Sequence, residues 1–464
     1  MSDEQLFNHA IYLHREGRRN EALETLLDLS RRNPDNGYIW GTLGMVWSSV
    51  GKIPQAVEAF EKAVRLDPTT EIWRQELGYI LIQEGKFTEV EKYCNGSSFS
   101  SKLMRAKLWE VQGEDEQALE ILEGVIDDPP SGVYDGRALP IEAHLAKAKC
   151  IYARCARRRG KSLDGLKMLA RPNVIPSTPQ HLVQDSLTDN LEVLYEKGYC
   201  YDALGEYDAA WSCFLAANQL QNSSFEPEVY KGRIRRGIES PRSHQGTRGG
   251  SNLIFIVGIP RSGTSLVEQI LSRHPQVTPM GERTEIAFIS HELDAKGWPD
   301  LEPSQIDDYA DSYLENCPEG VMTDKMPDNW YNVGLIRQMF PEAKVVHCIR
   351  DPQDCLVSCF MQMFGHSGMG WSNSLEGLQT YFNLWKESEV GGLEVHYEEL
   401  VSRPEEAIRA LLEDLDLPYD ERCLSPEGSG RHVATASYAQ VKEPIHQRSI
   451  GRGAHYERHL KIVS

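Results

Sequence analysis

Two hydrophobic patterns divide the chain. In the first half, small and apolar residues return every 34 positions: Gly17, Gly51 and Gly85 keep this step, as do Ala10, Gly44 and Gly78, and Pro34 and Pro68. From Leu253 onward that repeat stops, and short runs of β-branched apolar residues alternate with helical segments. A repeat of this length predicts stacked helical pairs, whereas apolar runs separated by helices predict a parallel sheet covered on both faces. The expected fold is therefore a helical array followed by an α/β domain.

The clearest copy of the repeat shows how a helical pair is built. It carries aromatic, small and turn residues at fixed offsets, namely Trp40, Leu43, Gly44, Trp47, Gly51, Ala56, Phe60, Ala63 and Pro68. The small residues Gly44 and Ala56 let two antiparallel helices approach each other. Gly51 lies in the turn between them, and Pro68 ends the second helix. This set closely resembles the tetratricopeptide consensus.

About six helical pairs are predicted for residues 1–240, with irregular spacing in the later copies. Insertions are expected near Asp127–Ile141 and Pro172–Gln184, and a capping helix at Glu226–Ile238. Solenoids of this kind serve as scaffolds and dimer interfaces, and they also hold peptides. A peptide or protein partner for the array and a purely structural array therefore both stay open.

The second half is predicted to alternate strands and helices. Strands are expected at Leu253–Ile259, Gly320–Lys325, Ala343–Arg350 and Leu393–Tyr397, and helices after the first strand and at Tyr331–Phe340 and Glu405–Leu415. The first strand is apolar throughout, as a buried central strand of a parallel sheet is. Between the halves, Pro241–Asn252 is rich in Gly, Ser and Arg and predicts a linker. The predicted domains are residues 1–240 and 253–464, joined by 241–252.

Composition and charge narrow the class of protein. The 464 residues include 40% hydrophobic and 25% charged residues, which excludes wholesale disorder, and the net charge of -20 disfavours bulk binding to nucleic acid or anionic lipid. The N-terminus does not look like a signal peptide, and no apolar run is long enough for a membrane span. Ten cysteines are scattered without a CxxC pair. They predict reduced thiols of a cytoplasmic protein, and no metal site is expected.

A glycine-rich segment after the first strand predicts an anion site. Residues 258–265, GIPRSGTS, have the GxxxxG spacing of a phosphate-binding loop between a strand and a helix. The glycines let backbone N–H groups turn toward an anion, and the helix N-terminus adds positive potential. Thr264 stands where a nucleotide triphosphatase has lysine, which argues against a P-loop kinase, while Arg261 supplies a cation elsewhere in the loop. A tight turn without a ligand is the alternative.

A second anion contact is predicted after the strand Ala343–Arg350. Arg350 ends that strand, and Ser358 follows two turns into the next helix. The carboxyl ends of parallel strands line one crevice, so Arg350 can address the same molecule as the glycine-rich loop. An arginine fork with a hydroxyl suits a second, separate phosphate.

These motifs together resemble the sulfotransferase superfamily, which uses 3′-phosphoadenosine 5′-phosphosulfate. The segment IFIVGIPRSGTSLVEQILSRHP resembles the family's 5′-phosphosulfate loop, and VVHCIRDPQDCLVSCF resembles its 3′-phosphate segment. TDKMPDN, VHYEEL and RSIGRGAHYERHL also have counterparts. The resemblance covers about Leu253–Leu460. It is closest to bacterial tetratricopeptide-repeat sulfotransferases and more distant to tyrosylprotein sulfotransferases.

The resemblance implies roles for individual residues. Glu282, in PMGERTE, matches the catalytic glutamate of tyrosylprotein sulfotransferases and is the expected general base, with Glu285 as runner-up. Lys325 matches the lysine that touches the leaving-group oxygen, and Arg261 clamps phosphate or sulfonate. The donor-binding set is expected to comprise Arg261, Ser262, Gly263, Thr264, Ser265, Arg350, Ser358, Ser449, Gly451 and Arg452.

Two further segments match the family but do not define a role for each residue. Ser449–Arg452 matches the C-terminal loop that closes over the 3′-phosphate, but Gly453 and Ala454 follow where the family often has tryptophan or another basic residue. Tyr397 and Glu398, in the YEEL motif, are equally compatible with structural and functional roles. His347 lies on a buried strand and is expected to be a core residue.

The expected activity is transfer of a sulfonate group to an acceptor hydroxyl, with peptide or protein tyrosine as the first candidate acceptor. A small-molecule, lipid or glycan hydroxyl is the alternative acceptor. A repeat-based scaffold with a nucleotide-binding but silent domain is the alternative function. A homodimer is an expectation of the family only.

Overall fold

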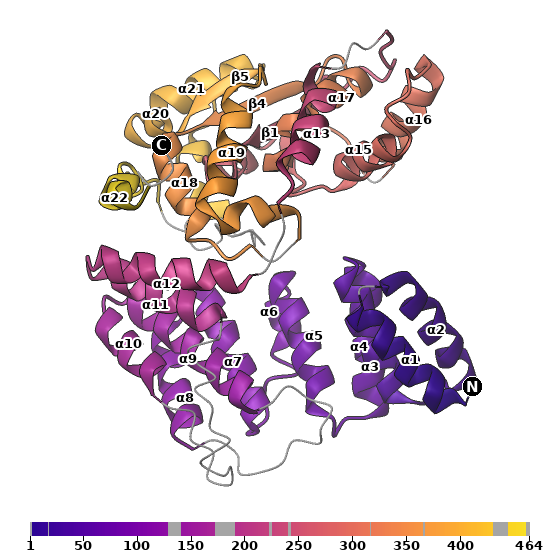
Figure 1. Cartoon of the computed structure of the whole chain (residues 1–464), viewed down its shortest axis with the longest axis vertical. Helices are drawn as coiled ribbons and strands as arrows, with labels where there is room; N and C mark the ends of the chain where they lie inside the picture. Colours follow the sequence, from indigo (N-terminus) through magenta and orange to yellow (C-terminus); the bar gives the residue numbers. More distant parts are fainter. Residues whose placement is uncertain are drawn as a thin grey trace. The chain divides into compact units, whose positions relative to one another are not determined.

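The computed structural model describes residues 2–16, 18–128, 141–171, 191–221, 225–239, 243–315, 317–364, 367–429 and 444–460. They form two compact units, Met1–Gly205 and Glu206–Ser464 (Figure 1). The first unit is helical and the second contains a sheet with helices on its faces. The predicted fold class, a tetratricopeptide-type helical region followed by an α/β domain with a parallel sheet, is confirmed. Within the described residues, no helix combines the length and apolar character needed to cross a membrane.

The first unit is a succession of antiparallel helices. They are α1 (Asp3–Arg15), α2 (Arg19–Arg32), α3 (Gly37–Ser49), α4 (Ile53–Leu66), α5 (Glu71–Gln83), α6 (Phe87–Val90), α7 (Phe99–Gln112), α8 (Asp115–Asp127), α9 (Ile141–Arg158), α10 (Ser162–Ala170) and α11 (Leu191–Ala203). Each helix packs chiefly on its neighbours in the chain, as expected for a solenoid. The structure does not describe residues 129–140 and 172–190, so most of the predicted insertion at Asp127–Ile141 and all of that at Pro172–Gln184 lie outside the described residues.

The clearest repeat copy folds for the reasons its residues suggest. A Cβ on Gly44 would lie 2.9 Å from the ring of Phe60, so glycine is what allows α3 and α4 to pack this closely. Gly51 has a φ of 75°, a left-handed conformation that costs glycine little, and forms the turn between the two helices. Helix α4 ends at Leu66, just before Pro68. The predicted helical pair is confirmed.

The second unit surrounds a parallel sheet. Its strands are β1 (Leu253–Gly258), β2 (Val277–Pro279), β3 (Val321–Lys325), β4 (Lys344–Ile349) and β5 (Leu393–His396). Its α-helices are α12 (Tyr207–Leu220), α13 (Pro227–Glu239), α14 (Thr264–Ser272), α15 (Glu285–Ala295), α16 (Pro303–Leu314), α17 (Val333–Met339), α18 (Pro352–Phe360), α19 (Leu375–Lys386), α20 (Tyr397–Ser402), α21 (Pro404–Asp414) and α22 (Glu457–Leu460). Its 3₁₀ helices are η2 (Pro327–Asn332), η3 (Ser367–Asn373), η4 (Glu421–Leu424), η5 (Pro426–Ser429) and η7 (Arg452–Tyr456).

The strand order β2-β3-β1-β4-β5 puts β1 at the centre. Every strand pairing is parallel, with Ile256 opposite Lys325 and Gly258 opposite Cys348. One face of β1 packs on a core shared with α14 and α21, and Phe255 on the other face stacks near Phe340. Each of the four predicted strands is present, whereas the three-residue strand β2 has too short an apolar run to be recognised in the sequence.

The division between the two units differs from the predicted boundary at 241–252. It falls after Gly205, because α12 and α13 pack on the sheet unit. The ring of Trp211 in α12 stacks on Phe360 at 4.5 Å, and the Asn218 side chain donates to the Phe360 carbonyl at 2.8 Å. Helix α13 was predicted to cap the helical array. The helix exists, but it packs on η2, α17 and α19, so the predicted capping role is wrong.

The described part of the predicted linker, residues 243–252, is fixed on the sheet unit. The Gly246 N–H donates to the Gln338 carbonyl at 2.8 Å, and the Thr247 N–H donates to Asp307 at 2.7 Å. Arg248 forms an ion pair with Asp311. Because of these contacts, the segment is an ordered part of the second unit that precedes β1.

Candidate active site

The glycine-rich segment forms a tight loop between β1 and α14. Gly258 and Gly263 have φ values of 148° and 103°, and a Cβ on Gly258 would lie 2.5 Å from the Cys348 carbonyl oxygen. Arg261 has a φ of 74°, which is uncommon for a residue with a side chain and marks a constrained loop. Glycine is therefore required where the loop approaches β4.

The loop has the features of an anion cradle. Thr264 and Ser265 are buried at the start of α14, where helix N–H groups lack intrahelical acceptors. The Ser262 side chain is buried, and its hydroxyl has no hydrogen-bond partner among the described residues. A buried hydroxyl without a partner is costly unless a ligand satisfies it. A phosphate or sulfonate oxygen fits this position.

The predicted 5′ and 3′ segments are linked directly. The Arg350 guanidinium donates to the Arg261 carbonyl at 3.1 Å, and the Arg261 Nε donates to the Ser358 hydroxyl at 2.9 Å. Arg350 is buried, and its guanidinium lies over the Tyr397 ring at 4.5 Å. Arg261, Arg350 and Ser358, separated by up to 97 residues, thus form one cluster at the ends of β1 and β4.

The YEEL motif supports this cluster. The Tyr397 ring lies beneath Arg350 and within 2.8 Å of where a Cβ on Gly263 would stand. The Glu398 carboxylate accepts a hydrogen bond from the Asp351 N–H at 2.9 Å. Tyr397 and Glu398 therefore hold the loops that carry Gly263 and Arg350 in place.

Glu282 and Lys325 meet at the end of β3. Their carboxylate and ammonium groups form a short ion pair. The Lys325 side chain is 1% exposed and the Glu282 side chain 39% exposed, so the pair reaches from the interior to the surface. Glu285, the runner-up for the base, instead pairs with Arg283 at 2.6 Å. The sheet register places Lys325 beside Ile256, two residues before Gly258.

Asp324, next to Lys325, belongs to the opposite face of β3. Successive strand residues point to opposite faces, and Asp324 accepts a hydrogen bond from the Tyr313 hydroxyl at 2.9 Å. Burial raises the pKa of Asp324 to about 7. His347 on β4 is also buried, and burial lowers its pKa to about 4 while its Nε2 accepts from Trp385. The expectation that His347 is a core residue is confirmed.

The C-terminal loop is held against α18 by a carboxylate that lies outside the predicted site residues. Asp354 accepts hydrogen bonds from the Gly451 N–H at 2.8 Å and the Gly453 N–H at 2.6 Å, and lies 3.6 Å from the Arg350 guanidinium. Arg350 also contacts the Ser449 carbonyl. Asp354 therefore joins the loop Ser449–Arg452 to the Arg350 cluster.

Gly453 explains one departure from the family pattern. A Cβ at this position would lie 2.8 Å from the backbone of Gln353, so a larger residue would push the loop away from α18. Arg452, the last predicted donor-binding residue, begins η7 and is half-buried. An acidic residue four positions after Arg350 was the one sequence signal that could have identified Asp354.

Replacing Asp354 by alanine is expected to free the C-terminal loop. The change leaves two loop N–H groups and Arg350 without their shared carboxylate, at a cost of about 3 kcal/mol. Hydrogen exchange of residues 449–456 should then be about 100-fold faster. Asp354→Asn keeps one acceptor oxygen, so its exchange rate should lie between those of the wild type and Asp354→Ala. Exchange at the wild-type rate in Asp354→Ala would contradict these contacts.

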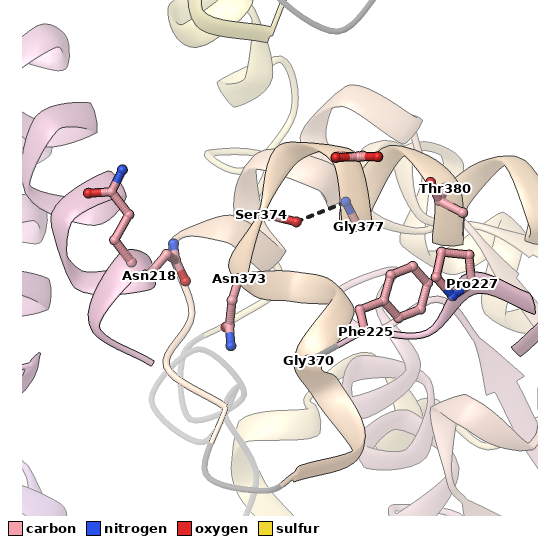
Figure 2. A pocket seen from close by; sticks show the side chains of 10 residues that line it. Asn218, Phe225, Pro227, Gly370, Asn373, Ser374, Gly377 and Thr380 are labelled. Carbon is pink, nitrogen blue, oxygen red and sulfur yellow. Dashed lines mark hydrogen bonds between the residues drawn. The ribbon is translucent and has the colours of Figure 1, made fainter. Parts of the chain in front are cut away.

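A separate pocket lies elsewhere in the second unit. Figure 2 shows it between the end of α12, η3 and the start of α19, lined among others by Asn218, Phe225 and Ser374. Its volume is about 330 Å³, and it has no basic side chain in its lining. None of the predicted site residues lines it.

Within the described part of the chain, no cluster of three or more histidine, cysteine or acidic side chains is placed to hold a metal ion. Arg261 and Arg350 supply cations at the loop, and Lys325 lies on β3, the strand that pairs with β1. The arrangement therefore combines an anion cradle with a carboxylate that can accept a proton and an ammonium that can stabilise negative charge.

Comparison with known protein families agrees with this arrangement. Residues 253–421 match the sulfotransferase family, and residues 38–70 and 191–224 match the tetratricopeptide repeat. The resemblance drawn from the sequence motifs is thereby confirmed, and the candidate site lies mainly within the matched sulfotransferase segment.

Relatives of the chain include proteins named for sulfotransfer. Protein-tyrosine sulfotransferase A of Caenorhabditis elegans is 28% identical over 239 residues, 45% of this chain and 62% of that protein. Protein-tyrosine sulfotransferase 1 of Danio rerio is 27% identical over 231 residues, 43% of this chain and 65% of that protein. An uncharacterized protein of Aquifex aeolicus is 32% identical over 294 residues, 56% of this chain and 39% of that protein. The chain thus covers less than two thirds of the length of each of these relatives.

Solved structures give weaker likenesses. The sulfotransferase domain of the Synechococcus PCC 7002 olefin synthase is 20% identical, with a TM-score of 0.33 over 47% of this chain and 90% of that chain. A tetratricopeptide repeat protein from Parabacteroides merdae is 16% identical, with a TM-score of 0.37 over 50% of this chain and 82% of that chain. At TM-scores this low, neither likeness bears on function.

Proposed function

We propose that the protein is a sulfotransferase that moves a sulfonate group from 3′-phosphoadenosine 5′-phosphosulfate to an acceptor hydroxyl. The observation that carries the proposal is the ion pair between Glu282 and Lys325 at the end of β3, next to the strand that leads into the glycine-rich loop. A base and a leaving-group cation side by side are what this reaction needs. The match of residues 253–421 to the sulfotransferase family supports the same reaction.

The donor fits the residues present. The loop from Ser262 to Ser265 would hold the 5′-phosphosulfate, with the Ser262 hydroxyl, which has no partner among the described residues, as one contact. Arg350 and Ser358 would address the 3′-phosphate, and the loop Ser449–Arg452 would cover it. Arg261, which touches both Ser358 and Arg350, would align the two segments.

In the proposed reaction, Glu282 accepts the proton of the acceptor hydroxyl. The acceptor oxygen forms a bond to sulfur as the bond between sulfur and the 5′-phosphate oxygen breaks. Lys325 stabilises the negative charge that develops on that phosphate oxygen, and adenosine 3′,5′-bisphosphate leaves. The ion pair between the Glu282 and Lys325 side chains supports this proposal, because it would keep a proton acceptor and a charge stabiliser close together.

A peptide or protein tyrosine is the proposed acceptor. Two relatives are named protein-tyrosine sulfotransferases, and the helical repeats offer a surface of the kind that binds peptides. The cytoplasmic location and the homodimer remain predictions from sequence.

Transfer of ³⁵S label from the donor tests the function. Purified protein is incubated with labelled donor and a library of tyrosine peptides and hydroxyl-bearing metabolites. Label on a peptide supports both the reaction and the tyrosine acceptor. Label on a metabolite, lipid or glycan supports the reaction but shows that the acceptor belongs to that class instead. Donor binding without transfer to any acceptor would favour the scaffold alternative, and binding of ATP with Mg²⁺ alone would overturn the proposal.

Arg350→Ala is expected to weaken donor binding about 100-fold while changing the rate of transfer at saturating donor much less. The change removes the buried guanidinium proposed to hold the 3′-phosphate. Titration of adenosine 3′,5′-bisphosphate by calorimetry measures the effect. Arg409→Ala, which removes an exposed arginine from α21, is the control. Unchanged affinity in Arg350→Ala would refute the 3′-phosphate assignment.

A further inference from the structure

The turn that presents Glu282 is fixed through both polar groups of Gly281. The Gly281 N–H donates to Glu268 Oε1 at 2.9 Å, and the Gly281 carbonyl accepts from the Lys325 N–H at 2.9 Å. Gly281 itself has a φ of 73°, a left-handed conformation suited to glycine. The residue before Glu282 is therefore held by one side chain and one strand.

The side chain that holds this turn comes from a buried position on α14. Glu268 is 2% exposed and lies on α14 among Val267, Ile270 and Leu271, which belong to the core against the sheet. A buried carboxylate is costly unless hydrogen bonds compensate it, so its presence needs an explanation. The hydrogen bond from the Gly281 N–H is one interaction that compensates this burial.

Helix α14 links the loop proposed to bind the donor to the turn that carries the proposed general base. Its first residue, Thr264, lies in the glycine-rich loop, and Glu268 follows four residues later, about one helical turn along. The first turn of α14 therefore contributes to the proposed donor-binding loop. The next turn carries Glu268, which contacts the turn at Gly281 before the proposed base Glu282.

We propose that Glu268 is a positioning residue for Glu282, which sets the place of the base relative to the sulfonate donor by fixing the Gly281 N–H. This role rests on the proposed sulfotransferase function. Glu268 touches neither the donor nor the acceptor in this proposal. It acts through the main chain, by keeping the Glu282 side chain where it meets Lys325.

The test compares variants of Glu268 in the full-length protein. Glu268→Met keeps the length of the side chain and removes the acceptor, so kcat for ³⁵S transfer should fall about 10- to 100-fold, as expected when a reacting group shifts by about 1 Å. Affinity for adenosine 3′,5′-bisphosphate should stay within about threefold, because the donor cradle is intact. Glu268→Gln keeps an acceptor oxygen and should restore kcat to within about threefold of wild type.

Controls separate this role from a general effect on folding. Glu292→Met makes the same substitution at a half-exposed position on α15 and should leave kcat within about twofold of wild type. If Glu268→Met does not fold, Glu268→Asp takes its place, because it keeps the charge, shortens the reach and should lower kcat about 10-fold.

The outcomes distinguish the role of Glu268 from the function itself. Full activity in Glu268→Met overturns the positioning role alone. The same holds if Glu268→Gln is as slow as Glu268→Met, or if donor affinity falls in step with kcat. A wild-type protein that transfers no label to any acceptor overturns the proposed function and this role together.

Discussion

Glu282→Gln is expected to lower kcat for sulfonate transfer by about 100- to 10,000-fold, because the amide keeps the shape of the side chain but cannot accept the acceptor's proton. Donor binding should change little, since the proposed contacts to the phosphates come from other residues. Single-turnover transfer of ³⁵S label, measured beside calorimetric titration of adenosine 3′,5′-bisphosphate, separates the two effects.

Glu285→Gln is the matched comparison for this result. Glu285 is three residues away in the same segment, but it pairs with Arg283 and not with Lys325. Its variant should transfer label within about threefold of the wild-type rate. If Glu285→Gln were the inactive variant and Glu282→Gln the active one, the general base would have to be reassigned to Glu285.

Lys325→Met should lower kcat by about 100- to 1,000-fold. The substitution keeps most of the volume of a side chain that is 1% exposed, but it removes the charge proposed to stabilise the leaving phosphate. It also leaves the Glu282 carboxylate without its partner. The loss should appear mainly in the chemical step, measured by single-turnover transfer at saturating donor.

Lys344→Met provides the control for a strand lysine. Lys344 begins β4, at the opposite end of its strand from Arg350, and pairs with Asp416 at 2.5 Å. Transfer by this variant should match wild type. Lys325→Met with wild-type kcat would show that negative charge on the leaving group is stabilised by another cation, with Arg261 the first to be tested.

Much of the fold could be predicted because its signals are local. The strand at Leu253–Gly258 is apolar at each position, and a central parallel strand is buried on both faces. The helical pair around Gly44 was predictable because small residues recur where helices touch. The partner of α13 was not predictable, since an amphipathic helix shows that one face is buried but not against what.

Some residues of the candidate site could likewise be predicted from the sequence, and others could not. Arg261, Lys325 and Arg350 stand in short motifs next to predicted strand ends, where the order of strands and helices already places ligand-binding residues. Glu282 was expected only because its motif resembles that of a known family. Glu268 and Asp354 carry no such motif. Their partners, Gly281 and the Gly451–Gly453 loop, lie 13 and up to 99 residues away in the chain, so only folding reveals the contacts.

The sequence by itself determined the repeat, the parallel sheet and the residues expected at its carboxyl ends, because periodicity and motif spacing are properties of neighbouring positions. Tertiary structure decided that α12 and α13 belong with the sheet unit, that Arg261 and Ser358 touch, and that Asp354 holds the C-terminal loop. These contacts depend on which buried polar groups find partners once distant segments pack. Such pairing is a property of the folded chain and leaves no periodic trace in the sequence.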